Sequence, residues 1–351
     1  MLIKKILFLP LIFCLLLCAG CNNDLTDANS DRHTVITDSI GRQVSLPQTV
    51  TKVAVANRYN MEIIKSLGVL DRVVGVDYGI YQDQAAYGEF FSKEQVIGKS
   101  QNDLNYEKII ELQPQLLILT GNGAWQDAAK KLEPFGIRII VMDAYYTSAF
   151  EHTYTLAGQI FQQEAKAAAF ISYFQDKLQY IRTALKNVPK KTVYYEYRNR
   201  GTTTIPGDYF FEMLEYAHAD NIFRDAKSTE INIEAVVQQN PDAIVKVGAA
   251  GVDPKYIPPT AADFMQRHQE LVERPGWTAI KAVQNDKILL LSQYAHGGAS
   301  KLVGTMYIAK FLYPEYLPDL HPEQVFKDWV TKYQHLDYRP GHTDPPFALT
   351  D

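Results

Sequence analysis

Short runs of apolar and β-branched residues alternate with amphipathic stretches along most of the chain. The short runs predict strands at 52–57, 72–77, 115–119 and 136–142, and again at 192–197, 242–248 and 287–292. Apolar residues at helical spacing separate them, for example at 60–67 and 300–312. Strands that alternate with helices in this way are typical of βαβ units with parallel sheets. The pattern therefore predicts an α/β fold with mainly parallel sheets.

A long stretch without any strand pattern lies between the two groups of strands. From 148 to 187 the chain has no proline and one glycine, Gly158. Ser148 and Glu151 have the spacing of a capping box, and Pro189 ends the helical pattern. About 38 helical residues would form a rod about 57 Å long. We expect one long rigid α-helix at 147–189, between an N-terminal lobe at 34–146 and a C-terminal lobe at 190–351.

One sequence motif occurs in both lobes. NYEKIIELQPQLLI (105–118) and NIEAVVQQNPDAIV (232–245) each contain Asn-x-Glu, an apolar pair, a proline and an apolar run. An asparagine N-cap, an apolar helical stripe and a proline that ends the helix before a strand account for this pattern. The repeat predicts two Rossmann-like βα lobes that are copies of one fold.

Glu107 and Glu234 occupy the second helical position of the two copies, away from the apolar stripe, so we expect both to face water. The simplest interpretation is a favourable charge at a helix N-terminus, worth about 0.3–1 kcal/mol. The same glutamate in the same motif twice favours another interpretation. In it, the two carboxylates are matched contact points for a two-fold partner that bears arginines.

The N-terminal segment differs from the rest of the chain. Lys4 and Lys5 precede an apolar run at 6–19, which is too short to span a bilayer comfortably. The run ends in LCAGC, which resembles a bacterial lipobox, so we expect a signal peptide at 1–20, lipidation of Cys21 and a flexible tether at 21–33. The alternative is a plain secretory signal with an incidental cysteine. All three cysteines lie in this segment, so cleavage before Cys21 would leave a mature chain with one cysteine and no disulfide.

The composition narrows the class of protein only slightly. The chain is 46% apolar and 21% charged, with a formal net charge of −5. This balance is typical of a globular protein, and it offers no basic excess for binding nucleic acid.

Together, the lipobox, the two lobes, the connecting helix and the paired N-x-E-x-[IV]-[IV]-x-x-x-P motif resemble the substrate-binding lipoproteins of ABC importers. The resemblance is to the class with a rigid helical backbone, which handles ferric siderophores, cobalamin and haem. TIPGDYFFEML and the following NIF, within 204–223, are also similar to that class, although 217–221 lacks the usual Ala-Gly-Gly. The resemblance covers about 33–333 of the printed sequence.

The resemblance carries several implications for partners and location. It implies a monomer without a cofactor, anchored by lipid to the bacterial membrane and facing the periplasm or the cell exterior. In that family, one glutamate on each lobe docks on the complex of ABC permease and ATPase. By motif position these residues are Glu107 and Glu234.

A ligand site is expected between the lobes, because ligands of open α/β sheets bind beyond the carboxyl ends of the strands. The residues placed there are mainly aromatic or basic. Aromatic faces suit a large, partly apolar ligand, whereas arginine suits a carboxylate, a phosphate or another oxyanion. The candidates are Arg58, Tyr59, Tyr78, Trp125, Tyr145, Arg198, Arg200, Tyr294 and His296.

The sequence leaves two classes of ligand open. The first is an iron complex, such as a ferric siderophore or haem, or cobalamin. The second is an oxyanion such as molybdate or tungstate, held by arginines and helix N-termini. A bare divalent metal is disfavoured because it needs three or four converging ligands, and His296 is the only histidine that the pattern places there.

Two other functions compete with transport. An enzyme on the same scaffold has no support from a G-x-S-x-G, P-loop, H-E-x-x-H or dinucleotide motif. A surface adhesion or sensor lipoprotein is compatible with the sequence.

Overall fold

The computed structural model describes residues 33–248 and 256–349. The expected signal peptide, the lipidation site Cys21 and nearly all of the tether lie outside these residues. Within the two described ranges, no helix is both long enough and apolar enough to cross a membrane.

The first lobe is built on a four-stranded parallel sheet with the strand order β4-β3-β7-β8. The strands expected from the sequence form it, somewhat shorter than expected. A β1-β2 hairpin and a small β5-β6 pair flank the sheet. In chain order the elements are β1 (His33–Thr37), β2 (Gln43–Pro47), β3 (Val53–Val55), α1 (Arg58–Ser66), β4 (Val73–Val76), α2 (Tyr78–Gln82), α3 (Gln84–Tyr87), β5 (Gly98–Ser100), β6 (Asp103–Leu104), α4 (Tyr106–Leu112), β7 (Leu116–Leu119), α5 (Trp125–Leu132) and β8 (Arg138–Val141).

The second lobe carries a separate five-stranded sheet with the order β10-β9-β11-β12-β13. Its strands are parallel except for β13, which pairs antiparallel with β12 at the edge. In chain order the elements are β9 (Lys191–Tyr197), α8 (Tyr209–Tyr216), β10 (Ala219–Asn221), α9 (Glu234–Gln239), β11 (Ala243–Val247), α10 (Ala261–Val272), α11 (Lys281–Gln284), β12 (Ile288–Leu291), α12 (Gln293–Gly297), α13 (Leu302–Leu312), α14 (Pro322–Asp328) and β13 (Thr343–Asp344).

Both sheets are buried on their two faces, as parallel sheets require. Every residue of β7, β11 and β12 is buried. One apolar cluster runs through both lobes and the connecting helices, and a smaller cluster lies on the other face of each sheet. The two lobes and their linking helices therefore share a continuous core.

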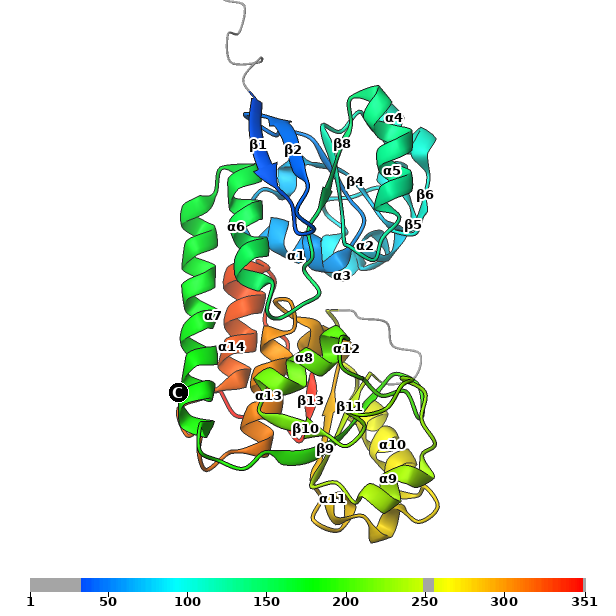
Figure 1. Ribbon diagram of the computed structural model, residues 1–351, viewed down its shortest axis with the longest axis vertical. Helices are drawn as coiled ribbons and strands as arrows, with labels where there is room; N and C mark the ends of the chain where they lie inside the picture. Colours follow the sequence, from blue (N-terminus) through cyan, green and yellow to red (C-terminus); the bar gives the residue numbers. More distant parts are fainter. Residues whose placement is uncertain (1–32, 249–255, 350–351) are drawn as a thin grey trace, which may run out of the picture.

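The connection between the lobes differs from the expected single helix. Two helices, α6 (Phe150–Phe161) and α7 (Glu164–Leu185), replace it, and the chain reverses at Gln162, whose φ is 56°. Figure 1 shows α6 beside the upper part of α7, which alone runs from one lobe to the other. With 22 residues, α7 is about 33 Å long, well short of the expected rod.

Close packing explains how the helices can reverse on one another. A Cβ built on Gly158 of α6 would lie 2.9 Å from the Cβ of Ala167 in α7, so only glycine allows this approach. The expected capping box does not form: the N-cap of α6 is Ala149, without a side-chain bond. Instead, the backbone N–H of Ser148 donates to the carboxylate of Glu212 in α8 at 3.2 Å, which links the two lobes.

The repeated motif takes nearly the same structure in both lobes. Gln113 and Asn240 both end their helices in the left-handed region, with φ of 49° and 46°, directly before the two prolines. The N-termini differ by one residue. The side chain of Asn105 accepts the N–H three residues on, whereas that of Asn232 accepts the N–H of Glu234. Helix α9 therefore begins at Glu234, which is its first residue and not its second.

Candidate ligand site between the lobes

The carboxyl ends of strands from both lobes meet at one interface. Figure 1 shows α1, α2 and α3 on the lower side of the first lobe, facing α8 and α12 on the upper side of the second. Arg58 and Tyr59 begin α1 just after β3, and Tyr145 follows β8. Tyr294 and His296 lie in α12, just after β12. The structure thus places these candidates around one junction.

Aromatic rings from both lobes pack against one another at this junction. Tyr145 of the first lobe stacks on Tyr209 of α8, with ring centroids 4.9 Å apart, and meets the edge of Tyr59 at 5.0 Å. Phe210 lies 4.5 Å from Tyr209. Each such pair stabilises a structure by about 0.5–1.5 kcal/mol beyond its buried area. Tyr209 and Phe210 were not among the candidates, although they belong to the TIPGDYFFEML stretch that carries the family resemblance.

Lys301 is the residue at this junction that the sequence did not reveal. Its side chain is fully buried, and its ammonium donates to the carbonyl oxygen of Tyr145 at 2.5 Å. The ammonium lies 4.3 Å from the ring centroid of Tyr59, 4.5 Å from that of Tyr209 and 4.9 Å from that of Tyr145. A lysine in a loop before a helix carries no sequence signal for such a position.

The backbone that holds Lys301 is unusual. Ala299, Ser300 and Lys301 all adopt positive φ, at 49°, 55° and 70°. Residues other than glycine rarely enter this region, and strained backbone of this kind is concentrated at ligand sites and switch regions. The loop between α12 and α13 is therefore constrained to aim Lys301 at the first lobe.

A second cation, the partly buried Arg58, lies on the first-lobe side of the junction. Its guanidinium approaches the carboxylate of Glu62 to 3.1 Å and lies 4.6 Å from the ring centroid of Tyr294 in the other lobe. Burial raises the pKa of Glu62 to about 7, against the opposing effect of Arg58. Arg58 thus pairs with Glu62 within α1 and contacts the other lobe through its cation–π interaction with Tyr294.

His296 is enclosed in the second lobe. It is 1% exposed, and its Nε2 lies 3.0 Å from the hydroxyl of Tyr195. Burial, and then the charge of Lys301, lower the pKa of His296 to about 3, so its imidazole is neutral at physiological pH. Residues 33–248 and 256–349 contain no cluster of three or more His, Cys, Asp or Glu side chains that could hold a metal ion.

Three other candidates lie at the rim of the junction. Both Nε and Nη2 of Arg198 donate to the amide oxygen of Gln293, at 2.9 and 2.5 Å. Arg200 is exposed two residues further on. On the first lobe, Tyr78 begins α2 and is 43% exposed, with its ring 6.1 Å from that of Tyr81. These side chains leave aromatic and guanidinium groups accessible beside the buried junction.

Trp125 does not join the other candidates. It begins α5 and packs against the smaller apolar cluster on the outer face of the first sheet. The guanidinium of Arg42, in the β1-β2 hairpin region, lies 4.6 Å from its ring centroid. Its ring therefore contacts Arg42 and this cluster.

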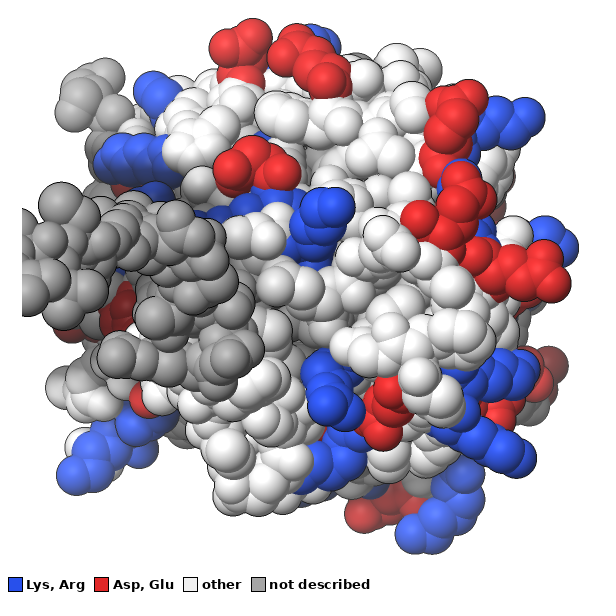
Figure 2. All heavy atoms as spheres, turned by 90° about the horizontal axis from the view of Figure 1, so that it is seen from above, with Lys and Arg blue, Asp and Glu red and all other residues white. Residues whose placement is uncertain are grey.

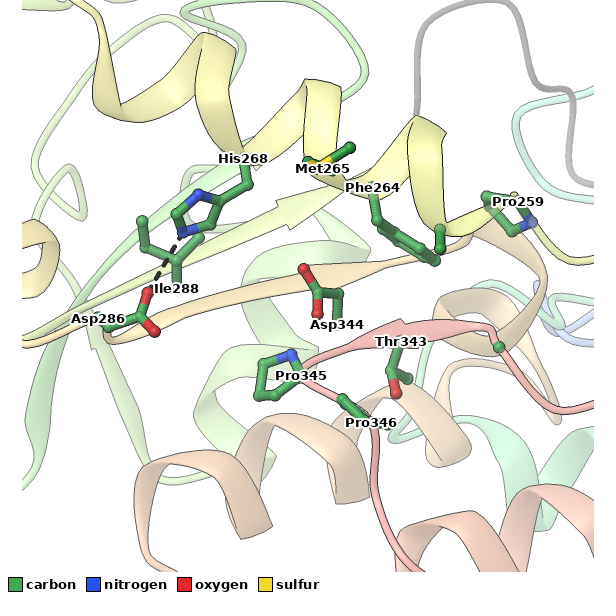
Figure 3. A pocket seen from close by; sticks show the side chains of 12 residues that line it. Pro259, Phe264, Met265, His268, Asp286, Ile288, Thr343, Asp344, Pro345 and Pro346 are labelled. Carbon is green, nitrogen blue, oxygen red and sulfur yellow. Dashed lines mark hydrogen bonds and ion pairs between the residues drawn. The ribbon is translucent and has the colours of Figure 1, made fainter.

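A separate hollow of about 540 Å³ lies in the second lobe, between α10 and the edge strand β13. Figure 3 shows Phe264 and Met265 on one side of it and Pro345 and Pro346 on the other, with His268 bonded to Asp286 at one end. None of the candidate residues lines this hollow.

The two motif glutamates lie on different lobes and are both exposed. Figure 1 places α4 and α9 on the side of the molecule away from α7. Within the described residues, the carboxylates of Glu107 and Glu234 have no ion pair or hydrogen bond. Figure 2 looks down on the first lobe, where acidic side chains gather along the edge that carries α4 and α5. The exposed acids of this stretch include Asp103 and Glu111.

Two parallel sheets, a linking helix and a polar, aromatic junction between the lobes define a bilobed binding protein. A family model described as "Periplasmic binding protein" matches residues 53–295, and the chain belongs to this family. It is an ABC transporter substrate-binding protein, in a family of extracytoplasmic transport proteins and not of enzymes.

Two relatives match most of the chain, and others match about half of it. An uncharacterized ABC transporter substrate-binding lipoprotein, YvrC of Bacillus subtilis, is 27% identical over 323 residues, covering 87% of this chain and 96% of the relative. The molybdate-binding protein MolA of Haemophilus influenzae is 21% identical over 346 residues, covering 88% and 93%. Vitamin B12-binding proteins of Vibrio species match about half of the chain, for example 52% with 25% identity for Vibrio vulnificus, and 66% of that relative.

Solved structures share the fold. The TroA-like periplasmic binding protein FepB of Veillonella parvula superposes with a TM-score of 0.74 at 21% identity, covering 88% of this chain and 98% of the other. Molybdate-bound MolA of Haemophilus influenzae gives a TM-score of 0.70 at 18% identity, covering 88% and 99%. The expected family and fold class are therefore confirmed.

Proposed function

We propose that this protein captures its ligand between the two lobes and delivers it to an ABC permease and ATPase complex through Glu107 and Glu234. The observation that carries the docking proposal is the pair of exposed, unpaired carboxylates at matching positions of the repeated motif. A carboxylate that has no partner in its own chain is available to an arginine of another protein.

Charge reversal of both residues tests this docking. Uptake of the ligand in cells should collapse in the double variant Glu107→Lys, Glu234→Lys, whereas the affinity of the purified protein for its ligand should stay unchanged. The matched control is Glu111→Lys with Glu230→Lys, which changes the net charge equally at exposed acids other than the two repeated glutamates. Wild-type uptake by the double variant, or equal loss in the control, would refute the role of the two glutamates.

We propose an iron complex, such as a ferric siderophore or haem, or cobalamin as the ligand. The exposed Tyr78, the half-buried Tyr145 and Tyr209, and the rim guanidiniums of Arg198 and Arg200 support a large ligand with apolar faces and anionic groups. The relatives named for vitamin B12 agree with this class.

An oxyanion such as molybdate or tungstate is the second candidate. It is favoured by the two cations at the junction, the buried Lys301 and the partly buried Arg58, and by similarity to MolA over 93% of that relative. A thermal-shift screen against ferric siderophores, haem, cobalamin, molybdate and tungstate separates the two classes, because a ligand that binds only the native state raises Tm by mass action.

We further propose that lipidation of Cys21 anchors the protein outside the cytoplasm. The lipobox-like LCAGC segment and the lipoprotein relatives support this anchor. Replacement of Cys21 by serine should move the protein from the membrane fraction to the soluble fraction. A membrane-bound serine variant would refute the anchor while leaving the ligand proposal intact.

A further inference from the structure

The ammonium of Lys301 is a buried charge without a counter-ion at the junction of the lobes. The side chain is 0% exposed, and within the described residues no carboxylate lies within ion-pair distance of its Nζ. Of its three N–H donors, one has a hydrogen-bond acceptor, the carbonyl oxygen of Tyr145. The aromatic faces around it supply the remaining contacts.

Lys246 of the same lobe shows the usual way to bury a lysine. It is 1% exposed, and its Nζ lies 2.9 Å from a carboxylate oxygen of Glu196 and donates to the carbonyl oxygen of Arg198. Burial of a charge is costly unless a counter-ion and hydrogen bonds compensate for it. Lys246 meets this requirement within the protein, whereas Lys301 does not.

The groups that face Lys301 come from both lobes. Its nearest acidic groups are Glu62 of α1, Asp143 after β8, and Asp208 and Glu212 at the start of α8, all beyond ion-pair distance. His296, on α12, is neutral. Burial lowers the pKa of Lys301 to about 7, and these acids only partly oppose the effect.

The half-buried Tyr145 and Tyr209 stack on each other beside Lys301, whose ammonium lies 4.9 and 4.5 Å from their ring centroids. Because the two rings belong to different lobes, a small separation of the lobes would part them and expose the ammonium. Lys301 is already held there by three consecutive residues of positive φ, so the cation does not have to move to meet a ligand.

We propose that Lys301 is the counter-charge for an anionic oxygen group of the ligand, which enters between Tyr145 and Tyr209. The group is a carboxylate, a phosphate or a metal oxyanion, and it takes up the N–H donors of Lys301 that have no acceptor in the protein. This inference rests on the proposed ligand site between the lobes, but not on docking to the permease.

Calorimetric titration of the purified protein tests this role, with molybdate, a ferric tricatecholate siderophore and haem as the probes. Replacement of Lys301 by methionine should weaken the binding of whichever probe the wild type binds by at least about tenfold, because a charge-assisted hydrogen bond contributes about 1.5–3 kcal/mol. The Tm of the variant without ligand should equal or exceed that of the wild type, since an unpaired buried charge is removed. Binding of molybdate would identify a free oxyanion as the ligand, whereas binding of an iron chelate would identify an anionic iron complex.

Lys65 supplies a matched control. It is 3% exposed, donates to the carbonyl oxygen of Ala86 at 2.8 Å, and lies 4.8 Å from the ring centroid of Tyr87, again without a carboxylate at ion-pair distance in the described residues. Lys65→Met should therefore leave ligand affinity unchanged. Equal losses in the two methionine variants, or unchanged binding by Lys301→Met, would overturn the proposal.

The pH dependence of binding gives a second readout, which also serves if the methionine variant does not fold. Wild-type affinity should fall as pH rises above about 7 and Lys301 loses its proton. Lys301→Arg keeps its charge, so the affinity of this variant should fall less. The remaining fall comes from deprotonation of Glu62, whose pKa is also about 7. An identical fall in the arginine variant would refute the assignment. The assignment would also be overturned if a ligand without an anionic oxygen group bound the wild type and the Lys301→Met variant equally. Import through Glu107 and Glu234 would not be affected by that result.

Discussion

Replacement of Glu196 by alanine should destabilise the second lobe strongly, because this buried carboxylate is the acceptor for a whole network. Arg274 donates to it twice, at 2.9 Å each, and Lys246 approaches to 2.9 Å. The hydroxyl of Tyr194 and the backbone N–H of Gly201 add donors at 2.6 and 2.9 Å. The variant would leave two buried cations without their anion.

The size of the effect follows from this geometry. Loss of one partner of a buried ion pair costs about 3–5 kcal/mol. At about 2–4 °C per kcal/mol, Tm should fall by roughly 6–20 °C. Thermal unfolding followed by circular dichroism measures this shift. The matched control is Glu270→Ala, which removes a partly exposed Arg267–Glu270 pair and should cost about 0–1 kcal/mol.

The same network makes a pH prediction. The hydrogen bonds and charges around it lower the pKa of Glu196 to about 2, against burial. A depressed carboxyl pKa contributes stability that is complete above the unfolded pKa of about 4.3 and is lost as pH falls toward 2. Glu196→Ala should remove that part of the acid sensitivity. A loss of less than about 1 kcal/mol, or unaltered acid sensitivity, would show that the network does not hold the lobe together.

Three further predictions concern the junction and the connection of the lobes. The pKa of Glu62 is raised to about 7, so its contribution to stability is complete below its unfolded pKa and is lost as pH rises through 7. Glu62→Gln should therefore flatten this part of the curve of unfolding free energy against pH, measured by urea unfolding. An unchanged slope would contradict this prediction. Gly158→Val should lower the unfolding free energy by about 1–3 kcal/mol, because the new side chain meets Ala167 of α7; wild-type stability of the variant would show that the helices can separate freely. Ligand binding should compact the protein only slightly in small-angle scattering, because α7 and the shared core join the lobes; a large fall in the radius of gyration would refute this.

Local sequence patterns predicted the elements of the fold well. Seven apolar runs became strands of the two main sheets, since a continuous apolar run of this length has few alternatives to a buried parallel strand. The repeated motif gave matching helices and strands in both lobes. The short strands β10 and β13 were not predicted, because they add to the sheet edges with only two or three residues and little apolar pattern.

The connecting segment shows why the length of a helical pattern does not determine the length of a helix. Residues 148–187 have helical spacing throughout, and neither glutamine at the reversal is a helix breaker. The reversal at Gln162 is favoured by burial of α6 against α7, to which the residues on both sides contribute. Local propensity differs little between the two arrangements, so tertiary packing decides.

In the candidate site, too, local sequence placed some residues correctly and tertiary packing decided the position of others. Strand ends and aromatic residues were enough to place Arg58, Tyr59, Tyr145, Tyr294 and His296 near one junction, because residue type and topology are written in the sequence. Trp125 also follows a strand, yet its side chain packs against the smaller apolar cluster of the first lobe, which no linear pattern specifies.

By itself, the sequence determined two α/β lobes, a duplicated Asn-x-Glu motif and exposed positions for its two glutamates, because these follow from periodicity, caps and prolines along short segments. Only the tertiary structure decided the reversal between α6 and α7 and the burial of Lys301 among rings from both lobes. Both depend on contacts between segments far apart in the chain, such as 145 and 301, and the energy of such contacts is absent from any local stretch of residues.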